Sequence, residues 1–261
     1  MRKLIKTLAI ATAVTLSGAA TAETPDHAKP TIVLVHGAFA ESSSWNGVVA
    51  KLERDGYHVI AAANPLRSVA SDAAAVSTVI KSAPGPVVLV GHSYGGAVIT
   101  EAANGNANVK ALVYVSAFAP DAGENSLDLT GKFPGSTLAG ALAAPVPLSG
   151  GGSDLYIDQT KFPQQFAADV PLAQAKLMAA TQRPVTQAAL SEAPRAAAWK
   201  VVPSYAIYGS ADRNIPPSVL KFMADRAHAR ETVVIDGASH VVMVSHPDAV
   251  AAVIEKAATA K

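Results

Sequence analysis

The sequence predicts an α/β protein whose mainly parallel, six-stranded sheet is flanked by helices and carries an inserted helical cap. From Thr31 onward, short apolar runs alternate with longer alanine-rich stretches. Strands that are apolar throughout are typical of a parallel sheet covered on both faces, and the longer stretches suit helical crossovers. Half of the 261 residues are apolar and 16% are charged, which excludes a disordered chain.

The elements follow in order from local patterns. The last helix is the best marked, because Pro247 suits a first helical turn and Asp248 favours the positive end of the helix dipole. Strands are expected at 31–35, 58–62, 87–90, 111–115, 204–208 and 232–235, and helices at 45–55, 69–81, 95–104, 217–226 and 247–257.

The alternation breaks between residues 120 and 200. This segment contains several prolines and glycines, a flexible run at 149–153 and no convincing strand. Helices are expected at 162–168, 172–180 and 186–192, too many residues for an ordinary crossover. We interpret the segment as a helical cap of the kind that covers a site.

The first 22 residues predict a secretory signal. Arg2, Lys3 and Lys6 precede an apolar stretch that ends near a small-residue cleavage site at 20–22. The apolar stretch is shorter than the ~20 residues that span a bilayer, which argues against a membrane anchor. We therefore expect a mature α/β domain over 23–261, periplasmic or secreted, with no stable membrane association after cleavage.

Charge and cysteine content exclude several function classes. Removal of the signal leaves 18 basic and 20 acidic residues, without a basic run, so no nucleic-acid partner is expected. The chain has no cysteine, which excludes disulfides and thiol chemistry. Its histidines lack a metal-ligand spacing, so neither a metal nor another cofactor is expected.

The strongest motif is Gly91-His92-Ser93-Tyr94-Gly95, which directly follows an expected strand and opens an expected helix. A serine at such a turn is held in a strained conformation with its hydroxyl exposed, and the flanking glycines avoid clashes. Ser93 is therefore the candidate nucleophile.

A serine nucleophile needs a base, and the base needs an acid. Asp212 and His240 each follow a late strand, and parallel strands bring such loops to one edge of the sheet. Asp121, which also follows a strand, is the rival acid. Among the other histidines, we expect His36 to hold its loop by hydrogen bonds and His92 to point away from Ser93.

Acyl transfer also needs donors for the developing oxyanion. We expect the backbone N–H of Tyr94 and that of Ala38, in the loop after the first strand, with Phe39 as the alternative to Ala38.

With these motifs in this order, the mature chain resembles the α/β-hydrolase superfamily, in particular the branch of bacterial EstC-like esterases, plant methyl-ester esterases and plant hydroxynitrile lyases. The resemblance rests on residues 36–39 with Ser44-Trp45, on 91–96, on the Asp212 loop and on 237–240. It implies a triad of Ser93, Asp212 and His240. The lyases carry a lysine after the triad histidine and a threonine after the first-loop histidine, whereas this chain has Val241 and Gly37, which favours an esterase.

The expected function is the hydrolysis of small to medium, largely apolar carboxylic esters through an acyl-enzyme. Alternatives on the same fold are a lyase, a cofactor-free haloperoxidase or perhydrolase, and a non-catalytic ligand carrier. The oligomeric state and the natural ester are left open. The expected substrate-binding residues are Phe39, Trp45, Leu127, Phe133, Phe162 and Val241.

Overall fold

The computed structural model describes residues 29–260, so the predicted signal at 1–22 lies outside the described residues. The chain forms the expected sheet of six strands, all parallel, in the order β2-β1-β3-β4-β8-β9. The predicted fold class is confirmed. The strands are β1 (Thr31–Val35), β2 (Val59–Ala62), β3 (Val87–His92), β4 (Val109–Val115), β8 (Ser204–Gly209) and β9 (Thr232–Ile235).

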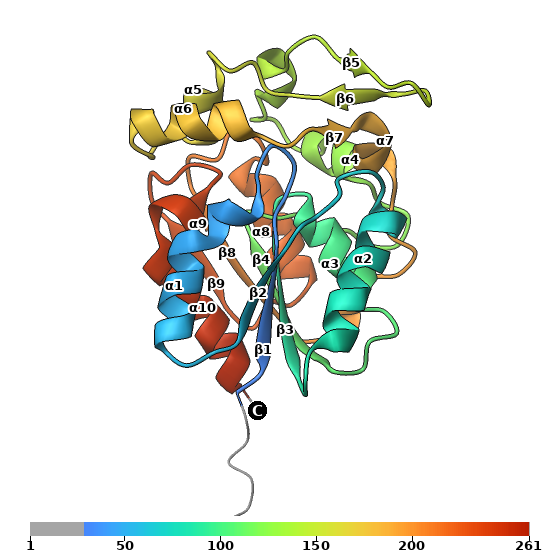
Figure 1. Cartoon of the computed structure of the whole chain (residues 1–261), viewed down its shortest axis with the longest axis vertical. Coiled ribbons are helices and arrows are strands. Elements are labelled where there is room, and N and C mark those ends of the chain that lie inside the picture. The colour runs from blue at the N-terminus through green and yellow to red at the C-terminus, as the bar shows by residue number, and fades with distance from the viewer. Residues whose placement is uncertain (1–28, 261) are drawn as a thin grey trace, which may run out of the picture.

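Helices cover both faces of this sheet (Figure 1). On one side α1 (Asn46–Arg54) packs against α10 (Pro247–Thr259), and on the other α2 (Val69–Ser82) packs against α3 (Gly95–Ala102), while α8 (Pro217–Arg226) lies against β8. β1 and β3 are buried along their whole length because they lie between these layers. Burial on both faces therefore explains why the sequences of these strands are continuous apolar runs.

The cap lies across the end of the sheet where the parallel strands terminate (Figure 1). It contains α4 (Ser126–Gly131), α5 (Phe162–Phe166), α6 (Leu172–Thr181) and α7 (Gln187–Ser191). Shorter elements are the 3₁₀ helices Ser42–Trp45, Leu138–Ala141 and Ala198–Lys200, and α9 (Val242–Ser245). None of the helices within 29–260 is long and apolar enough to cross a bilayer.

The expectation of no strand in the cap was wrong. A small antiparallel sheet joins β5 (Val146–Pro147), β6 (Ser153–Leu155) and β7 (Val185–Thr186). Strands of two or three residues are too short to show a period-2 pattern. The glycine run is not a loose linker but the turn between β5 and β6, where the Leu148 N–H donates to the Gly152 carbonyl at 3.1 Å and Gly152 has φ +78°.

Arg67, in the loop after β2, fastens the cap to the sheet domain. Its guanidinium donates to Asp154 Oδ1 at 2.6 Å and to the Pro184 carbonyl at 2.9 Å. Its own carbonyl accepts a hydrogen bond from the Thr186 hydroxyl at 2.7 Å. These contacts reach β6 and β7, so the short cap sheet is held to the loop that follows β2.

The turn from β3 into α3, residues 91–96, is called the serine turn below. A Cβ atom added at Gly91 would lie 2.6 Å from the Gly95 carbonyl oxygen, and one added at Gly95 would lie 2.5 Å from the Val35 carbonyl oxygen. Both distances are shorter than any real Cβ contact. The two glycines are therefore required by close backbone approach, as the motif predicted.

We predict that Gly95→Ala destabilises the protein, because its methyl group would push α3 away from β1. Overpacking of this kind costs about 2 kcal/mol or more, which lowers Tm by about 4 to 8 °C in a chain of this size. Thermal unfolding followed by circular dichroism measures the shift. Gly140→Ala is the matched control, since a Cβ there meets nothing within 4 Å; an equal Tm for both variants would contradict the packing argument.

Candidate active site

Ser93 lies in the serine turn with φ +54°, a left-handed conformation that non-glycine residues rarely adopt. Its carbonyl accepts hydrogen bonds from the N–H groups of Gly96 at 2.9 Å and Phe118 at 3.1 Å, which hold the strained backbone in place. The residue is 7% exposed and borders a cavity. The turn thus fixes the hydroxyl at the cavity wall.

His240 and Asp212 form a buried hydrogen-bonded pair. The His240 Nδ1–H donates to Asp212 Oδ2 at 2.7 Å, and Asp212 Oδ1 accepts from the N–H groups of Asn214 at 2.8 Å and Ile215 at 3.0 Å. This arrangement fixes the imidazole tautomer, so that the free lone pair is on Nε2. His240 Nε2 has no partner among residues 29–260, and His240 lines the same cavity as Ser93.

Asp121, the rival acid, and His246, a further histidine at the start of α10, lie in other settings. Asp121 is partly exposed and is paired with Lys200 at 2.6 Å. His246 lies beside Ser245 and 3.7 Å from Asp169, and neither Asp121 nor His246 lines the cavity. Asp212 is therefore the carboxylate that contacts His240, whereas Asp121 contacts Lys200.

His36 holds the loop after β1, as expected. Its Nδ1–H donates to the Gly37 carbonyl at 3.0 Å, and the Asn64 N–H donates to its Nε2 at 3.0 Å. The Asn64 side-chain amide N–H donates a hydrogen bond to the His36 carbonyl at 2.9 Å. Burial, with a smaller contribution from the charge of Arg183, lowers the pKa of His36 from 6.5 to about 4, so the ring is neutral at pH 7.

His92 lies against His240 rather than toward the cavity. Its Nε2–H donates to the His240 carbonyl at 3.2 Å, and the two ring centroids are 4.7 Å apart. Trp45 packs edge-on against the other part of the His92 ring, with centroids 6.4 Å apart. Complete burial lowers the pKa of His92 well below 6.5, so a neutral ring supports the backbone at His240.

Two backbone amides are available for an oxyanion. The Phe39 N–H donates to the Arg183 carbonyl at 3.0 Å, whereas the N–H groups of Ala38 and Tyr94 have no acceptor within residues 29–260. The Tyr94 hydroxyl donates to Asp72 Oδ2 at 2.9 Å, which anchors that residue, and burial raises the pKa of Tyr94. Of the two candidates in the first loop, Ala38 is the one with a free donor.

The cavity bordered by Ser93 has a volume of about 470 Å³. None of its lining residues within the described chain is an aspartate, glutamate, lysine or arginine. Its walls come from the ends of β1, β3 and β4 below and from the cap above. Its apolar lining residues include Phe39, Phe118, Leu127, Phe133, Leu138, Leu142, Leu155, Phe166, Leu190 and Ile215.

Three of the six expected substrate-binding residues, Phe39, Leu127 and Phe133, line this cavity, and three do not. Trp45, Phe162 and Val241 are fully buried in the protein core instead. The Phe162 ring packs at a tilt against the Phe166 ring, with centroids 4.8 Å apart, and Trp45 lies behind His92. These three predictions are corrected, because apolar residues near a site in sequence can pack beneath it.

Sequence reasoning missed Phe118 and Ile215 as lining residues. Both follow the end of a strand, β4 and β8, by a few residues. That position was used to find Asp212 and could have indicated them too. Within residues 29–260, no group of three or more histidine, aspartate or glutamate side chains is placed to hold a metal ion.

A family model described as "Alpha/beta hydrolase family" matches residues 32–253. Alpha/beta hydrolase nvfD of Aspergillus novofumigatus is 28% identical over 249 residues, covering 88% of this chain and 97% of that protein. The carbendazim hydrolyzing esterase of a Nocardioides species is 32% identical over 113 residues, covering 38% of this chain and 47% of that protein.

Solved structures show the same fold. Polyneuridine aldehyde esterase superposes with a TM-score of 0.74 at 20% identity, covering 87% of this chain and 98% of that one. A pyrethroid hydrolase from Sphingobium faniae JZ-2 superposes with a TM-score of 0.70 at 23% identity, covering 88% and 98%.

We predict that His36 makes stability fall in acid. Above pH 6.5 the ring is neutral in both states, but between pH 6.5 and pH 4 the unfolded chain binds a proton that the folded chain does not. Stability should therefore fall by about 3 kcal/mol from this group as the pH falls through that range. Urea unfolding at several pH values measures it.

His92 contributes in the same direction, so the informative comparison is between wild type and His36→Gln. The variant should lose less stability between pH 6.5 and pH 4, by about the same 3 kcal/mol. Identical pH dependence in the two proteins would show that His36 does not titrate in this way.

Proposed function

Because this chain belongs to the alpha/beta hydrolase family, we propose that it is a serine-dependent hydrolase of small to medium, largely apolar carboxylic esters. The observation that carries the proposal is the buried hydrogen bond from His240 Nδ1–H to Asp212, 2.7 Å long, which leaves Nε2 as the basic nitrogen. His240 and Ser93 line one cavity. A serine, an oriented base and a buried acid at one site are the parts that acyl transfer requires.

In the proposed mechanism, the Ser93 hydroxyl attacks the ester carbonyl while His240 Nε2 takes its proton. The positive charge that forms on the imidazole is stabilised by Asp212, whose carboxylate is already held by two backbone N–H groups. The carbonyl oxygen becomes an oxyanion, which accepts hydrogen bonds from the free N–H groups of Ala38 and Tyr94.

The tetrahedral intermediate then collapses. The C–O bond to the alcohol breaks, and His240 returns the proton to the departing alkoxide, which leaves the acyl group on Ser93. Water loses a proton to His240 and attacks the acyl-enzyme, and collapse of the second intermediate releases the acid and restores the Ser93 hydroxyl. No step needs a cofactor, because each proton passes between groups of this chain, the substrate and water.

The lining of the cavity supports the substrate class. An apolar space without charged side chains desolvates an uncharged ester at little cost, whereas it would leave a charged substrate unpaired. Two similar proteins are themselves named as an esterase and a pyrethroid hydrolase. The likeness in fold supports ester hydrolysis, and the cavity supports apolar esters in particular.

The proposal is tested by steady-state hydrolysis of p-nitrophenyl acetate, butyrate and octanoate. Ser93→Ala should lower kcat on the order of 10⁴-fold or more, because it removes the atom that forms the acyl-enzyme. Asp212→Asn should lower kcat on the order of 10⁴-fold, because the imidazole then loses the tautomer that leaves Nε2 basic.

Asp121→Asn is the matched control for the acid, since it makes the same chemical change at the rival carboxylate. Its loss of an exposed ion pair with Lys200 should change kcat by less than about twofold. Equal activity of Ser93→Ala and wild type would refute the serine mechanism. Cleavage of a cyanohydrin but of no ester would instead support the lyase alternative.

A further inference from the structure

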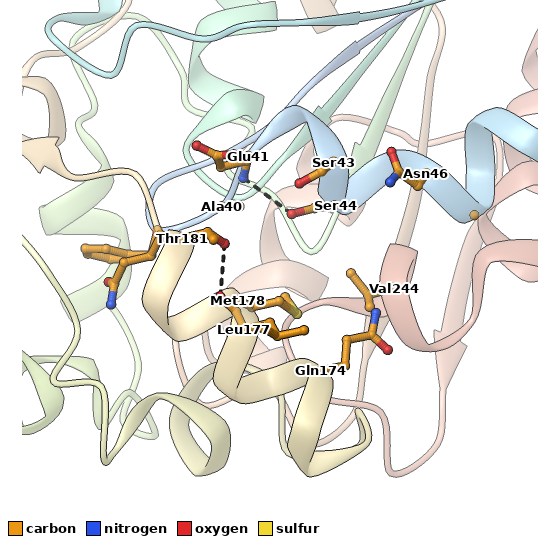
Figure 2. A pocket seen from close by; sticks show the side chains of 13 residues that line it. Ala40, Glu41, Ser43, Ser44, Asn46, Gln174, Leu177, Met178, Thr181 and Val244 are labelled. Carbon is orange, nitrogen blue, oxygen red and sulfur yellow. Dashed lines mark hydrogen bonds between the residues drawn. The ribbon is translucent and has the colours of Figure 1, made fainter.

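A second pocket, with a volume of about 330 Å³, lies on the outer side of the loop that follows β1 (Figure 2). The cap helix α6 forms one wall with Gln174, Leu177 and Met178. The opposite wall comes from the start of α1 and the 3₁₀ helix before it, and Val244 of α9 closes one end. This space is called the outer pocket.

The cavity bordered by Ser93 is called the catalytic cavity below. Phe39 is the one residue of the described chain that lines both the outer pocket and the catalytic cavity. Its neighbour Ala38 lines the catalytic cavity alone, and Ala40 on its other side lines the outer pocket alone. The chain therefore passes from one space to the other at Phe39. Phe39 is therefore the residue at which the cavity that contains Ser93 and the outer pocket meet.

The structure holds Phe39 firmly in this position. Its backbone has φ +60°, which is unusual for a bulky residue, and its N–H is bonded to the Arg183 carbonyl of the cap at 3.0 Å. Its ring is 3% exposed and packs edge-on against Phe166, with centroids 6.2 Å apart. Left-handed backbone of this kind is strained in a residue with a bulky side chain and persists where the surroundings enforce it.

We propose that the Phe39 ring is the partition that closes the catalytic cavity against the outer pocket, and that it sets the longest acyl chain that the enzyme accepts. The inference rests on the proposed ester hydrolysis. Without the ring, the two spaces join, and the distal part of a long chain can enter the outer pocket.

The outer pocket suits such an occupant. Leu177, Met178 and Val244 provide an apolar side for methylene groups, and Leu177 is 68% exposed, so a chain lying there would cover apolar surface that now faces water. Polar groups of Ser44 and Gln174 lie on the same pocket, and so does the carboxylate of Glu41, whose negative charge disfavours an acyl chain that carries its own carboxylate. The favoured occupant is therefore an unbranched, uncharged acyl chain.

The experiment measures kcat/KM for p-nitrophenyl esters from acetate to laurate. In Phe39→Ala, the ratio of laurate to butyrate should rise by at least about tenfold over wild type, since several methylene groups gain a place to bind. This ratio is independent of the fraction of protein that is folded. Phe39→Gly repeats the test with a residue suited to φ +60°.

Phe133→Ala is the matched control. It removes the same ring from the wall of the catalytic cavity but does not border the outer pocket, so its ratio should change by less than about threefold. Adding Met178→Trp to Phe39→Ala fills the outer pocket and should return the ratio to within about threefold of wild type.

Three results would overturn the inference, each with esters hydrolysed by wild type: an unchanged ratio in both Phe39 variants, an equal rise in Phe133→Ala, or no effect of Met178→Trp on the Phe39→Ala variant. If wild type hydrolyses no ester of the series, the proposed function fails, which is a different outcome from a failure of the partition alone.

Discussion

The arrangement of the site depends on the backbone of the loop after β1 lying directly against the serine turn. A Cβ atom at Gly37 would lie 2.5 Å from the Ser93 Cβ and 3.1 Å from the Tyr94 nitrogen, so a side chain at this position would force the two segments apart. This contact places the free amides of Ala38 and Tyr94 on the wall that also contains Ser93. The strained turn and the two free amides are therefore one packing unit.

Two buried carboxylates lie next to this unit: Asp212 accepts a hydrogen bond from His240, and Asp72 accepts one from the Tyr94 hydroxyl. Asp212 is satisfied by His240 and by two backbone N–H groups, which offsets the cost of burying a carboxylate. Burial keeps the two nearby histidines, His36 and His92, neutral, and they act through hydrogen bonds to the backbone. A proton on either ring would place a second cation near the imidazole that must accept one.

The sheet, and the meeting of Ser93, Asp212 and His240 at one edge of it, could be predicted from sequence because both follow from local rules. Fully buried parallel strands appear as continuous apolar runs, and the residues that meet at their carboxyl ends follow from strand order. The cap was less accessible, since β5, β6 and β7 have two or three residues each. The predicted substrate-binding residues were wrong where a residue lies close to the site but is buried beneath it. Trp45 packs behind His92, and Phe162 packs behind Phe166. Side-chain direction is set by tertiary packing, which composition does not reveal.

The central claim is that Ser93 forms a covalent acyl-enzyme, and rapid quenching tests it most directly. Protein mixed with p-nitrophenyl butyrate should release p-nitrophenol in a burst of about one equivalent if deacylation is the slower step, as ping-pong acyl transfer allows. Acid quenching during turnover, digestion and mass spectrometry should then find the butyryl group on the peptide that contains Ser93. An acyl group on another residue, or turnover of the ester by a protein from which Ser93 has been removed, would contradict the account.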